Sequence, residues 1–490
     1  MMGFIVAVIN KRRQDAAPTA VKMLRALAGD ADSGIYKLAS PTQVKTSKTL
    51  ESLENEKMKS PVVVGCLCST RSSVEGCQLT CLSKANLVFD GKLYRSKQKT
   101  LGLDLYDAGM HRDAFELAAK LVEESDGDFA FAIAEGDGVV AGRDSLGVRP
   151  LYHGADSCSV AVASERKALW SVGICEAESF PPGNVAIFDR ERARFRPLRV
   201  LAASGTRKMT LYQAAMKLQS LLRKSVTRRA SDVENVAVAF SGGVDSSLLA
   251  LLTNESGKKV QLVHASLEGQ PEVEHARKVA ETLKLPILFS LHRLRDLEEV
   301  LPKVMYAVET PDPLQVSIAV PVYWVAEKAH EVGCTVILAG QGADELFGGY
   351  KRYADMYLKH GGEEVRKVIA EDTLKMYKLN FERDSKVCGA FDVELRLPFA
   401  TYELAKFALT LPVELLLERS SETLRKLVLR RVAEDVGLPQ FVVERPKKAM
   451  QYTTGIIGAL IRLAKRKRQT LREYLLQQFI QVFGDMENGM

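Results

Sequence analysis

The chain has 490 residues and a formal net charge of +7, and 46% of its residues are hydrophobic and 26% charged. This length indicates roughly two to four domains, and the near-average composition excludes a disordered, collagen-like or coiled-coil protein. The mild positive charge permits an anionic ligand without requiring nucleic acid.

Eight cysteines are too few for a disulfide scaffold in a chain of this length. No apolar run approaches the roughly 18–20 residues needed to cross a bilayer. The apolar residues 3–9 precede the basic residues 11–13, which is the reverse of their order in a secretory signal. We therefore expect a soluble protein of the reducing cytoplasm that does not associate with a membrane.

Residues 1–195 are expected to form the first domain. Short β-branched runs separated by turn signals predict strands of a mostly antiparallel sheet. These runs lie at residues 4–9, 61–67, 85–89, 129–134, 138–141 and 160–163. Helices are predicted at residues 18–27 and 111–124, and the polar segment 36–60 is predicted to be a mobile loop.

Residues 196–210 are typical of a connector, and residues 211–490 form the second expected domain. Here apolar strands alternate with helical segments, which indicates a parallel sheet covered on both faces. The strands are predicted at residues 236–240, 260–265, 286–291 and 335–339, and helices at 211–227, 248–254 and 271–284. Residues 351–490 are expected to be mostly helical.

A phosphate-binding loop is predicted where the first strand of the second domain ends, at the sequence SGGVDSS (residues 241–247). A strand, a glycine turn and a helix in succession direct backbone N–H groups and the positive helix end toward an anion. Asp245 would repel a phosphate unless a cation lay between them, so it predicts Mg²⁺. A serine-capped helix without a ligand is the simpler alternative. The predicted phosphate ligands are Ser241, Gly242, Gly243, Ser246 and Ser247.

A second glycine-rich turn, AGQGADELFGGY (residues 339–350), follows another predicted strand. Loops at the carboxyl ends of neighbouring strands in a doubly wound sheet converge on one crevice. Asp344 and Glu345 in this turn would therefore face the phosphate loop, and two carboxylates there predict a magnesium–pyrophosphate site. A solvated acidic turn is the alternative; it fits Glu345 but leaves the glycines unexplained.

These two segments, in this order, resemble the synthetase domain of asparagine synthetases, which belong to the ATP pyrophosphatases. The resemblance continues through ETPDP (309–313), RD (383–384), ELRLPF (394–399) and ERPKK (444–448). It implies a C-terminal doubly wound α/β domain of the adenine nucleotide alpha hydrolase type, with a helical C-terminal part.

The first half is similar to the glutaminase domain of the same family, which is of the N-terminal-nucleophile (Ntn) hydrolase type. The segments that carry this similarity are GDFAFA (127–132), GRDSLGVRPLY (142–152), SERKAL (164–169) and PPG (181–183). The similarity implies an αββα sandwich, so the whole chain is expected to be an α/β protein with both domains in the family order.

The glutaminase pattern fails at three places. The family has a nucleophilic cysteine before the glycine that corresponds to Gly3, whereas this chain has Met2, and a thioether cannot be that nucleophile. The family's Gly-His-Arg-Arg, which supplies an arginine for the glutamine carboxylate, appears as Gly-Cys-Leu-Cys at residues 65–68. Its Asn-Gly-Glu, which stabilises the oxyanion, appears as Asp-Gly-Lys at 90–92, and a carboxylate there would repel an oxyanion. We expect a domain that folds without glutaminase activity.

Four cysteines close together raise the question of a metal site. They are Cys66, Cys68, Cys77 and Cys81. Four thiolates satisfy a tetrahedral zinc ion, but the spacing matches no common zinc module. Burial of the thiols on one face of a strand is the simpler interpretation.

The resemblance assigns roles in the second domain. ATP would lie over residues 241–247, with Asp245 and Asp344 holding Mg²⁺ on the pyrophosphate. Lys447 aligns with the family lysine that stabilises charge on the reacting phosphates. A carboxylate would attack the α-phosphorus, and ammonia or an amine would then convert the acyl-adenylate into an amide with release of AMP. Further nucleotide-binding positions by resemblance are Ala265, Ala339 and Gly340.

Gln341 departs from the family, which has a glutamate in its Ser-Gly-Glu-Gly motif; Ala339 replaces the serine. An amide cannot act as a general base, although it can orient a nucleophile or an intermediate. Gln341 is therefore counted as a catalytic candidate, but it weakens the assignment to aspartate specifically.

The leading interpretation is an AMP-forming amide ligase for aspartate or an analogue, supplied with free ammonia or with ammonia from a separate glutaminase. A second copy of the chain is a further candidate partner. The alternatives are a β-lactam-synthetase-like ligase for another carboxylate and an amine, a tRNA-modifying enzyme with the same loop, and a homologue that binds nucleotide without turnover. A basic helix at residues 462–472 favours the tRNA alternative, but no RNA-binding module is recognisable.

Overall fold

The computed structural model describes residues 3–29, 34–54, 58–68, 77–82, 84–94, 113–203, 205–419, 424–446, 448 and 450–484. The chain divides into two compact units, the first ending at Val200 and the second comprising Leu201–Gly484. Among the described residues, no helix combines the length and the apolar character needed to cross a membrane.

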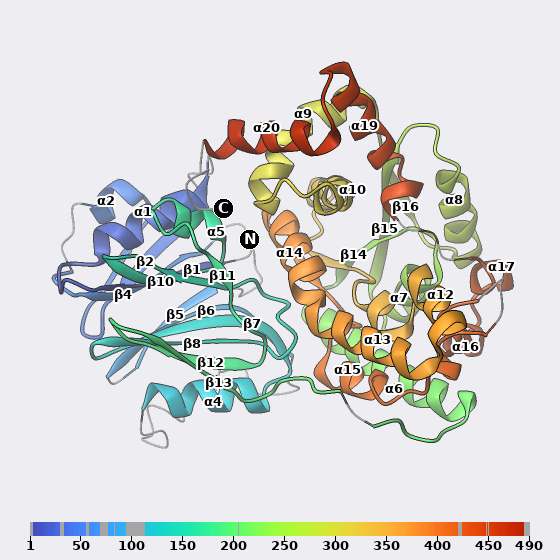
Figure 1. Ribbon diagram of the computed structural model, residues 1–490, viewed down its shortest axis with the longest axis horizontal. Helices are drawn as coiled ribbons and strands as arrows, with labels where there is room; N and C mark the ends of the chain where they lie inside the picture. The colour runs from blue at the N-terminus through green and yellow to red at the C-terminus, as the bar shows by residue number, and fades with distance from the viewer. Residues whose placement is uncertain are drawn as a thin grey trace. The chain divides into compact units, whose positions relative to one another are not determined.

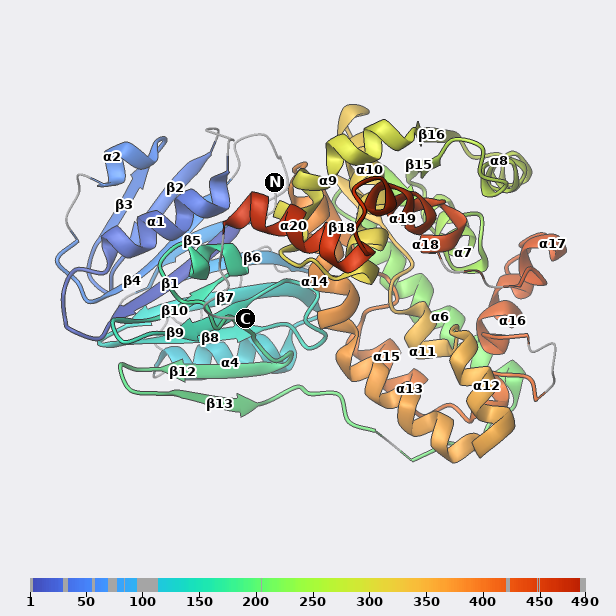
Figure 2. The ribbon, with the colours of Figure 1, turned by 45° about the horizontal axis from the view of Figure 1, so that its top comes forward.

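The first unit contains two antiparallel sheets (Figures 1 and 2). The seven-stranded sheet has the order β11-β9-β10-β1-β4-β2-β3, and the six-stranded sheet has the order β13-β12-β8-β7-β6-β5. The strands of the first sheet are β1 (Phe4–Asn10), β2 (Ile35–Ala39), β3 (Val44–Ser47), β4 (Val62–Cys68), β9 (Tyr152–Ala155), β10 (Ser159–Ala163) and β11 (Glu178–Ser179). Those of the second are β5 (Cys77–Cys81), β6 (Ala85–Leu93), β7 (Gly127–Glu135), β8 (Gly138–Arg143), β12 (Asn184–Phe188) and β13 (Ala193–Pro197).

The two sheets pack face to face, and helices cover their outer faces. On β1, Ile5 and Ala7 enter the apolar cluster between the sheets, whereas Val6 and Val8 enter the cluster beneath the helices of the first sheet. Both faces of the strand are therefore buried, which explains its unbroken apolar sequence. The covering helices are α1 (Ala17–Ala28), α2 (Leu50–Glu54) and α5 (Arg166–Trp170) on one sheet and α4 (Ala114–Glu124) on the other. The αββα sandwich is confirmed.

The charged residues of the segment GRDSLGVRPLY (142–152) are buried and stabilise the turn that follows β8. The Asp144 carboxylate accepts backbone N–H groups from Leu146 (3.0 Å), Val148 (3.1 Å) and Arg149 (3.0 Å). Burial raises the pKa of the Asp144 carboxyl, while Arg143 and these donors oppose that shift. Arg143 donates to backbone carbonyls of the same turn. The buried side chains of Arg143 and Asp144 thus stabilise the turn after β8 through its backbone.

The prediction of a mobile loop at residues 36–60 is wrong for the described part of that segment. It contains β2, β3 and α2, and β2 pairs with β4. Tyr36 and Leu38 are buried at alternate positions of β2, whereas Lys37 between them is only half-buried. This alternation has a period of two, as in any half-buried strand, but the surrounding Lys, Ser and Thr residues obscured it.

The second unit is built on five parallel strands in the order β16-β15-β14-β17-β18 (Figure 1). They are β14 (Asn235–Ala239), β15 (Lys259–Leu267), β16 (Ile287–His292), β17 (Val336–Leu338) and β18 (Glu394–Arg396). Val236, Ala237 and Val238 are successive and fully buried, so both faces of β14 are covered. The parallel α/β domain is confirmed. The sequence did not predict β18, which is short and has charged residues at both ends.

Helices make up most of the remainder of the second unit. They are α6 (Leu211–Ala230), α7 (Val244–Glu255), α8 (Glu272–Leu283), α9 (Leu294–Val308), α10 (Pro313–Glu331), α11 (Ala343–Phe347), α12 (Lys351–His360), α13 (Gly362–Met376), the π-helical turn Tyr377–Phe381, α14 (Glu382–Gly389), α15 (Tyr402–Ala408), the 3₁₀ turn Val413–Leu415, α16 (Leu427–Asp435), α17 (Gln440–Val443), α18 (Met450–Thr453), α19 (Ile456–Arg466) and α20 (Leu471–Phe483). The predicted basic helix at 462–472 is not one helix, because α19 ends at Arg466 and its exposed basic residues continue into the turn before α20.

Candidate nucleotide-binding site

The predicted phosphate loop lies between β14, which ends at Ala239, and α7, which begins at Val244. Gly242 has a φ of 69°, and a Cβ there would lie 2.9 Å from Cδ2 of His275. His275 also places its Nε2 2.9 Å from the Gly242 carbonyl oxygen. The turn therefore requires glycine for both its backbone conformation and its close packing against α8.

The serine hydroxyls of this loop are not equivalent. Ser241 is exposed, and its Oγ accepts the Gly243 N–H at 3.3 Å and lies 3.2 Å from Oγ of Ser246. Ser246 is buried at the edge of the loop, whereas Ser247 is fully buried within α7. Ser241 and Ser246 are thus the hydroxyls that lie together beside the backbone turn.

The second predicted loop packs directly against the first. A Cβ at Gly340 would lie 3.2 Å from the Asp245 Cβ, so the backbone after β17 approaches the start of α7 closely. Ala339 is buried at the end of β17, and Ala265 is buried on β15 two residues beyond Val263, the last residue that pairs with β14. The structure therefore brings the two glycine loops together at the carboxyl end of the sheet.

Lys426 joins the two acidic residues of these loops. Its Nζ lies 2.7 Å from Oδ2 of Asp245 and 2.6 Å from Oδ1 of Asp344, and its side chain is fully buried. A Cβ at Gly349 would lie 1.9 Å from Oδ1 of Asp344 and 2.4 Å from Cε of Lys426, so only glycine fits beside the pair. Sequence reasoning missed Lys426, because it belongs to none of the motifs that indicated the site.

Arginines fix the segment that carries Lys426. The Arg425 guanidinium donates to the Gly349 carbonyl at 2.8 Å, and Arg430 donates to the carbonyls of Arg425 at 2.6 Å and of Arg445 at 2.9 Å. Arg445 in turn forms an ion pair with Glu272 at the start of α8, and Lys448 Nζ lies 3.4 Å from the same carboxylate. Lys447, the lysine predicted to stabilise the reacting phosphates, lies outside the described residues.

The side-chain amide of Gln341 is oriented by the buried carboxylate of Asp384. Its Nε2 donates to Oδ2 of Asp384 at 2.5 Å. The Arg383 guanidinium binds both oxygens of that carboxylate, at 2.6 and 3.0 Å, and Asp384 is fully buried. The amide group therefore has a fixed orientation, in which its nitrogen is the end that faces the carboxylate.

Glu345 differs from its neighbour Asp344. It is buried and accepts hydrogen bonds from the Tyr350 hydroxyl and, at 2.7 Å, from Nδ2 of Asn380. Burial and, to a lesser extent, the Asp344 carboxylate raise the pKa of Glu345. Both expectations for Glu345, a carboxylate facing the phosphate loop and a solvated acidic turn, are therefore wrong.

Three of the further segments that carry the family resemblance contain buried ion pairs. Glu309, with a φ of 58°, receives Lys386 Nζ at 2.8 Å. Arg396 on β18 binds Asp232 at 2.6 Å and Glu394 at 2.9 Å. Together with the pair Arg383–Asp384, these contacts connect the ends of strands and helices around the site.

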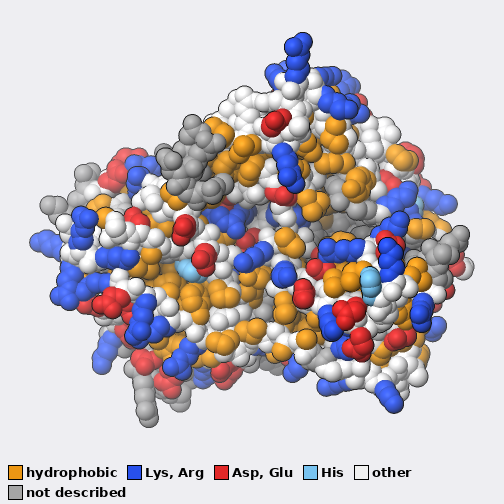
Figure 3. All heavy atoms as spheres, viewed as in Figure 1, with side chains coloured by type: hydrophobic (Ala, Val, Ile, Leu, Met, Phe, Trp, Pro, Cys, Tyr) orange, Lys and Arg blue, Asp and Glu red, His pale blue; other side chains and the backbone are white. Residues whose placement is uncertain are grey.

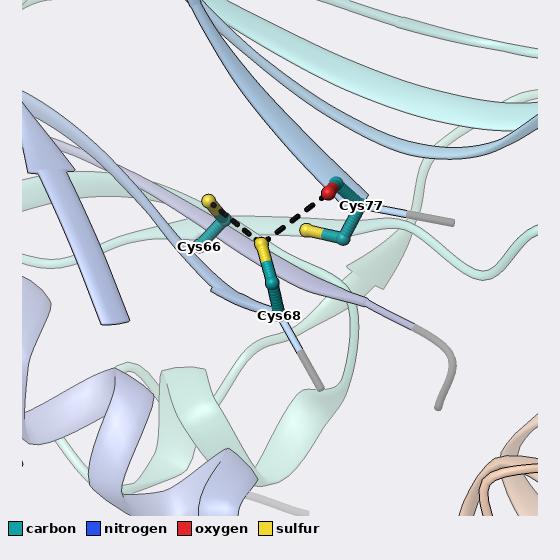
Figure 4. A group of neighbouring side chains, drawn as sticks. All are labelled: Cys66, Cys68 and Cys77. Atoms are coloured by element: carbon teal, nitrogen blue, oxygen red, sulfur yellow. Dashed lines mark hydrogen bonds between the residues drawn. The ribbon is translucent and has the colours of Figure 1, made fainter. Parts of the chain in front are cut away.

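The four cysteines considered as a zinc site do not form one group. The sulfur atoms of Cys66, Cys68 and Cys77 lie within 4.8 Å of one another, whereas Cys81 is exposed four residues further along β5 (Figure 4). Hydrogen bonds among the three thiols lower the pKa of Cys68 and raise the pKa values of Cys66 and Cys77. All eight cysteines of the chain are free thiols.

Comparison with known proteins agrees with these features. The model of the asparagine synthase family matches residues 217–366 and 357–482, and the model of a glutamine amidotransferase domain matches residues 85–171. A putative glutamine-hydrolysing asparagine synthetase of Methanocaldococcus jannaschii is 31% identical over 404 residues, which are 72% of this chain and 74% of that protein. The glutamine-hydrolysing asparagine synthetase of Zea mays is 28% identical over 363 residues, 70% of this chain.

The chain spans about 60% of the length of the plant relatives that it matches. Among solved structures, a glutamine phosphoribosylpyrophosphate amidotransferase from B. subtilis, in complex with ADP and GMP, aligns with a TM-score of 0.33 and 14% identity over 58% of this chain and 65% of that chain. That similarity is too low to support any argument.

The parallel sheet and its two glycine loops are those of an ATP-using α/β domain, preceded by an amidotransferase-like sandwich. The chain belongs to the asparagine synthase family. Within that family it is an asparagine-synthetase-like, ATP-dependent ligase.

Replacing Lys426 tests the central ion pair. Lys426→Met would remove the ammonium group that lies between the Asp245 and Asp344 carboxylates, and removing one partner of a buried ion pair costs about 3–5 kcal/mol. We expect the free energy of unfolding to fall by that amount and added Mg²⁺ to raise the midpoint of thermal unfolding more than in the wild type. Lys259→Met is the matched control, because Lys259 forms an exposed pair with Glu234 at the other end of the sheet. Equal stability of the two variants would contradict this role.

Glu345 predicts a dependence of stability on pH. Its folded-state pKa lies above the usual 4.5, so the stability that it contributes is complete below that value and is lost as the pH rises through the folded-state pKa. Glu345→Gln removes this loss, and its stability relative to the wild type should increase as the pH rises above about 4.5. Urea unfolding from about pH 4 to pH 8 measures the difference. A difference in stability between wild type and variant that does not change with pH would refute the effect, and Glu363→Gln, at an exposed position, is the control substitution.

Proposed function

We propose that the second unit uses ATP to activate the side-chain carboxylate of aspartate as an acyl-adenylate and then forms asparagine with ammonia. The carboxylate oxygen attacks the α-phosphorus, the bond to the bridging oxygen breaks and pyrophosphate leaves. Ammonia then attacks the carbonyl carbon, loses a proton and displaces AMP. The observation that supports this most directly is the convergence of Asp245, Asp344 and Lys426 beside the phosphate loop.

The residues at this site fit a phosphate chain and its cation. The turn at Gly242 and Gly243 and the start of α7 would bind phosphate oxygens through backbone N–H groups. Asp245 and Asp344 fit Mg²⁺, because both direct carboxylate oxygens toward a single cationic atom, Nζ of Lys426. When bound there, Mg²⁺ would neutralise charge on the pyrophosphate. The Lys426 ammonium would stabilise the same developing charge from within the protein, and the proposed role of Lys447 is to do so at the α-phosphate.

Gln341 would orient the nitrogen nucleophile. Because its amide nitrogen donates to Asp384, the carbonyl oxygen is the end that can accept a hydrogen bond from ammonia or an amine. The same residue favours a second candidate function, a β-lactam-synthetase-like ligation of another carboxylate with an amine, because the family's glutamate is absent at this position.

The nitrogen is proposed to come from free ammonia or from a separate glutaminase. At the positions of the family's two arginines, one of which binds the glutamine carboxylate, the first unit has Leu67 and Cys68, neither of which can bind a carboxylate as a guanidinium does. Asp90 is buried opposite Cys77, where a carboxylate would oppose an oxyanion.

The face drawn in Figure 3 does not favour the tRNA alternative. On the face drawn in Figure 3, Lys and Arg side chains are interspersed with Asp and Glu rather than gathered in one continuous patch. Nucleic-acid binding by charge needs such a patch or stripe.

A product assay tests the proposed reaction. The full chain with ATP, Mg²⁺, aspartate and ammonium should form AMP, pyrophosphate and asparagine in equal amounts, and glutamine in place of ammonium should yield no glutamate. If AMP forms only with a carboxylate other than aspartate, aspartate is not the substrate. If AMP forms only with tRNA, the protein is a nucleic-acid-modifying enzyme. Release of glutamate from glutamine would show a working glutaminase.

Gln341→Met separates the two half-reactions. Loss of one hydrogen bond to the nucleophile costs about 1.4 kcal/mol, or roughly tenfold in rate. We expect asparagine formation to fall by that factor and the KM for ammonia to rise, while aspartate-dependent exchange of pyrophosphate into ATP persists. Gln481→Met on the exposed face of α20 is the control. An equal fall in exchange and in amide formation would assign Gln341 to adenylation or to folding instead.

A further inference from the structure

Three thiols that take no part in the proposed reaction converge in the first unit. Cys66 and Cys68 lie on the same face of β4, and Cys77 begins β5 (Figure 4). The Cys66 and Cys68 sulfur atoms are 3.7 Å apart, and the Cys68 sulfur lies 3.3 Å from the Cys77 carbonyl oxygen. All three sulfur atoms lie within 4.8 Å of one another.

The group lies beside the start of β1. Cys66 pairs with Ile5 across β1 and β4, and the Cys77 sulfur lies 3.9 Å from the Phe4 carbonyl oxygen. A Cβ at Gly3 would lie 1.9 Å from Cβ of Cys77 and 2.5 Å from its sulfur, so Cys77 packs directly against the backbone of Gly3. The cluster thus borders the part of the sandwich in which a glutaminase of this family would bind glutamine.

The geometry suits one ion. Two thiolates bound at about 2.3 Å to a tetrahedral zinc ion lie about 3.8 Å apart, close to the 3.7 Å between the Cys66 and Cys68 sulfur atoms. Cys66 is buried, whereas Cys68 and Cys77 are half-buried, so the open side of the group is theirs. Lys37 is directly opposite Cys66 on β2, where its ammonium would offset the charge of three thiolates on a divalent ion.

We propose that Cys66, Cys68 and Cys77 bind one thiophilic d¹⁰ cation, Zn²⁺, with water as the fourth ligand. The thiols would lose their protons to solvent on binding. Because β4 belongs to the seven-stranded sheet and β5 to the six-stranded sheet, the ion would connect the two layers of the sandwich. This site is independent of the synthetase reaction, so its test does not depend on the proposed function.

Metal analysis of the full chain tests the site. Protein purified under reducing conditions, stripped with a chelator and titrated with Zn²⁺ against a chromophoric competitor should bind one ion per chain. Cys68→Ser and Cys77→Ser should each weaken binding at least tenfold, whereas Cys81→Ser on the same strand should bind as the wild type does. Co²⁺ in place of Zn²⁺ should give the thiolate charge-transfer absorption of a three-sulfur site in the wild type and in Cys81→Ser.

A second measurement keeps the test valid if a serine variant folds poorly. Zn²⁺ should protect three thiols of the wild type from alkylation, and mass spectrometry should identify them as Cys66, Cys68 and Cys77. Zn²⁺ should also raise the midpoint of thermal unfolding of the wild type. Binding of less than one ion per chain, undiminished binding by Cys77→Ser, or protection of other cysteines would overturn the proposal.

Discussion

The position of the two glycine loops relative to each other depends on the buried ammonium group of Lys426, which forms ion pairs with Asp245 in one loop and Asp344 in the other. A buried ammonium is tolerated only when anionic partners replace its hydration, and here each partner comes from a different glycine loop. The contact therefore fixes the distance between the two loops. The glycines follow from it, because Gly340 lets α7 approach the second loop and Gly349 leaves room for the carboxylate and the lysine stem.

Two other acidic residues near the second glycine loop, Glu345 and Asp384, are bound to different partners. Glu345 follows Asp344 directly but is turned toward Tyr350 and Asn380, and its raised pKa reflects its burial. Asp384 is neutralised by Arg383 and orients Gln341. Successive residues of one short helix thus have opposite roles, since one carboxylate faces the loop and the next is buried in the core. Such an arrangement concentrates the electrostatic interaction with a phosphate chain on a few atoms.

The sequence predicted the fold where burial leaves a local pattern. Strands β1 and β14 are buried on both faces and appear as unbroken apolar runs, whereas β2 alternates among polar neighbours and β18 has only three residues. The two glycine loops were recognisable from spacing, but Lys426 lies 181 residues from Asp245, and such a pairing has no local signature. The cysteines show that closeness in sequence does not by itself place side chains together. Cys66, Cys68 and Cys77 converge, whereas Cys81 is separated from Cys77 by the length of β5.

The first unit contains both residues that its fold requires and residues that its fold does not require. Arg143 and Asp144 are buried and organise a turn through backbone contacts, so a substitution there would cost stability whether or not the domain catalyses a reaction. Residues 65–68 have no such role, because a strand that lies between two sheets accepts cysteine as a small apolar residue at little cost. Folding therefore constrains the turn after β8 more strongly than it constrains the end of β4. The zinc ion proposed at Cys66, Cys68 and Cys77 would connect the two sheets where the end of β4 lies beside the start of β5.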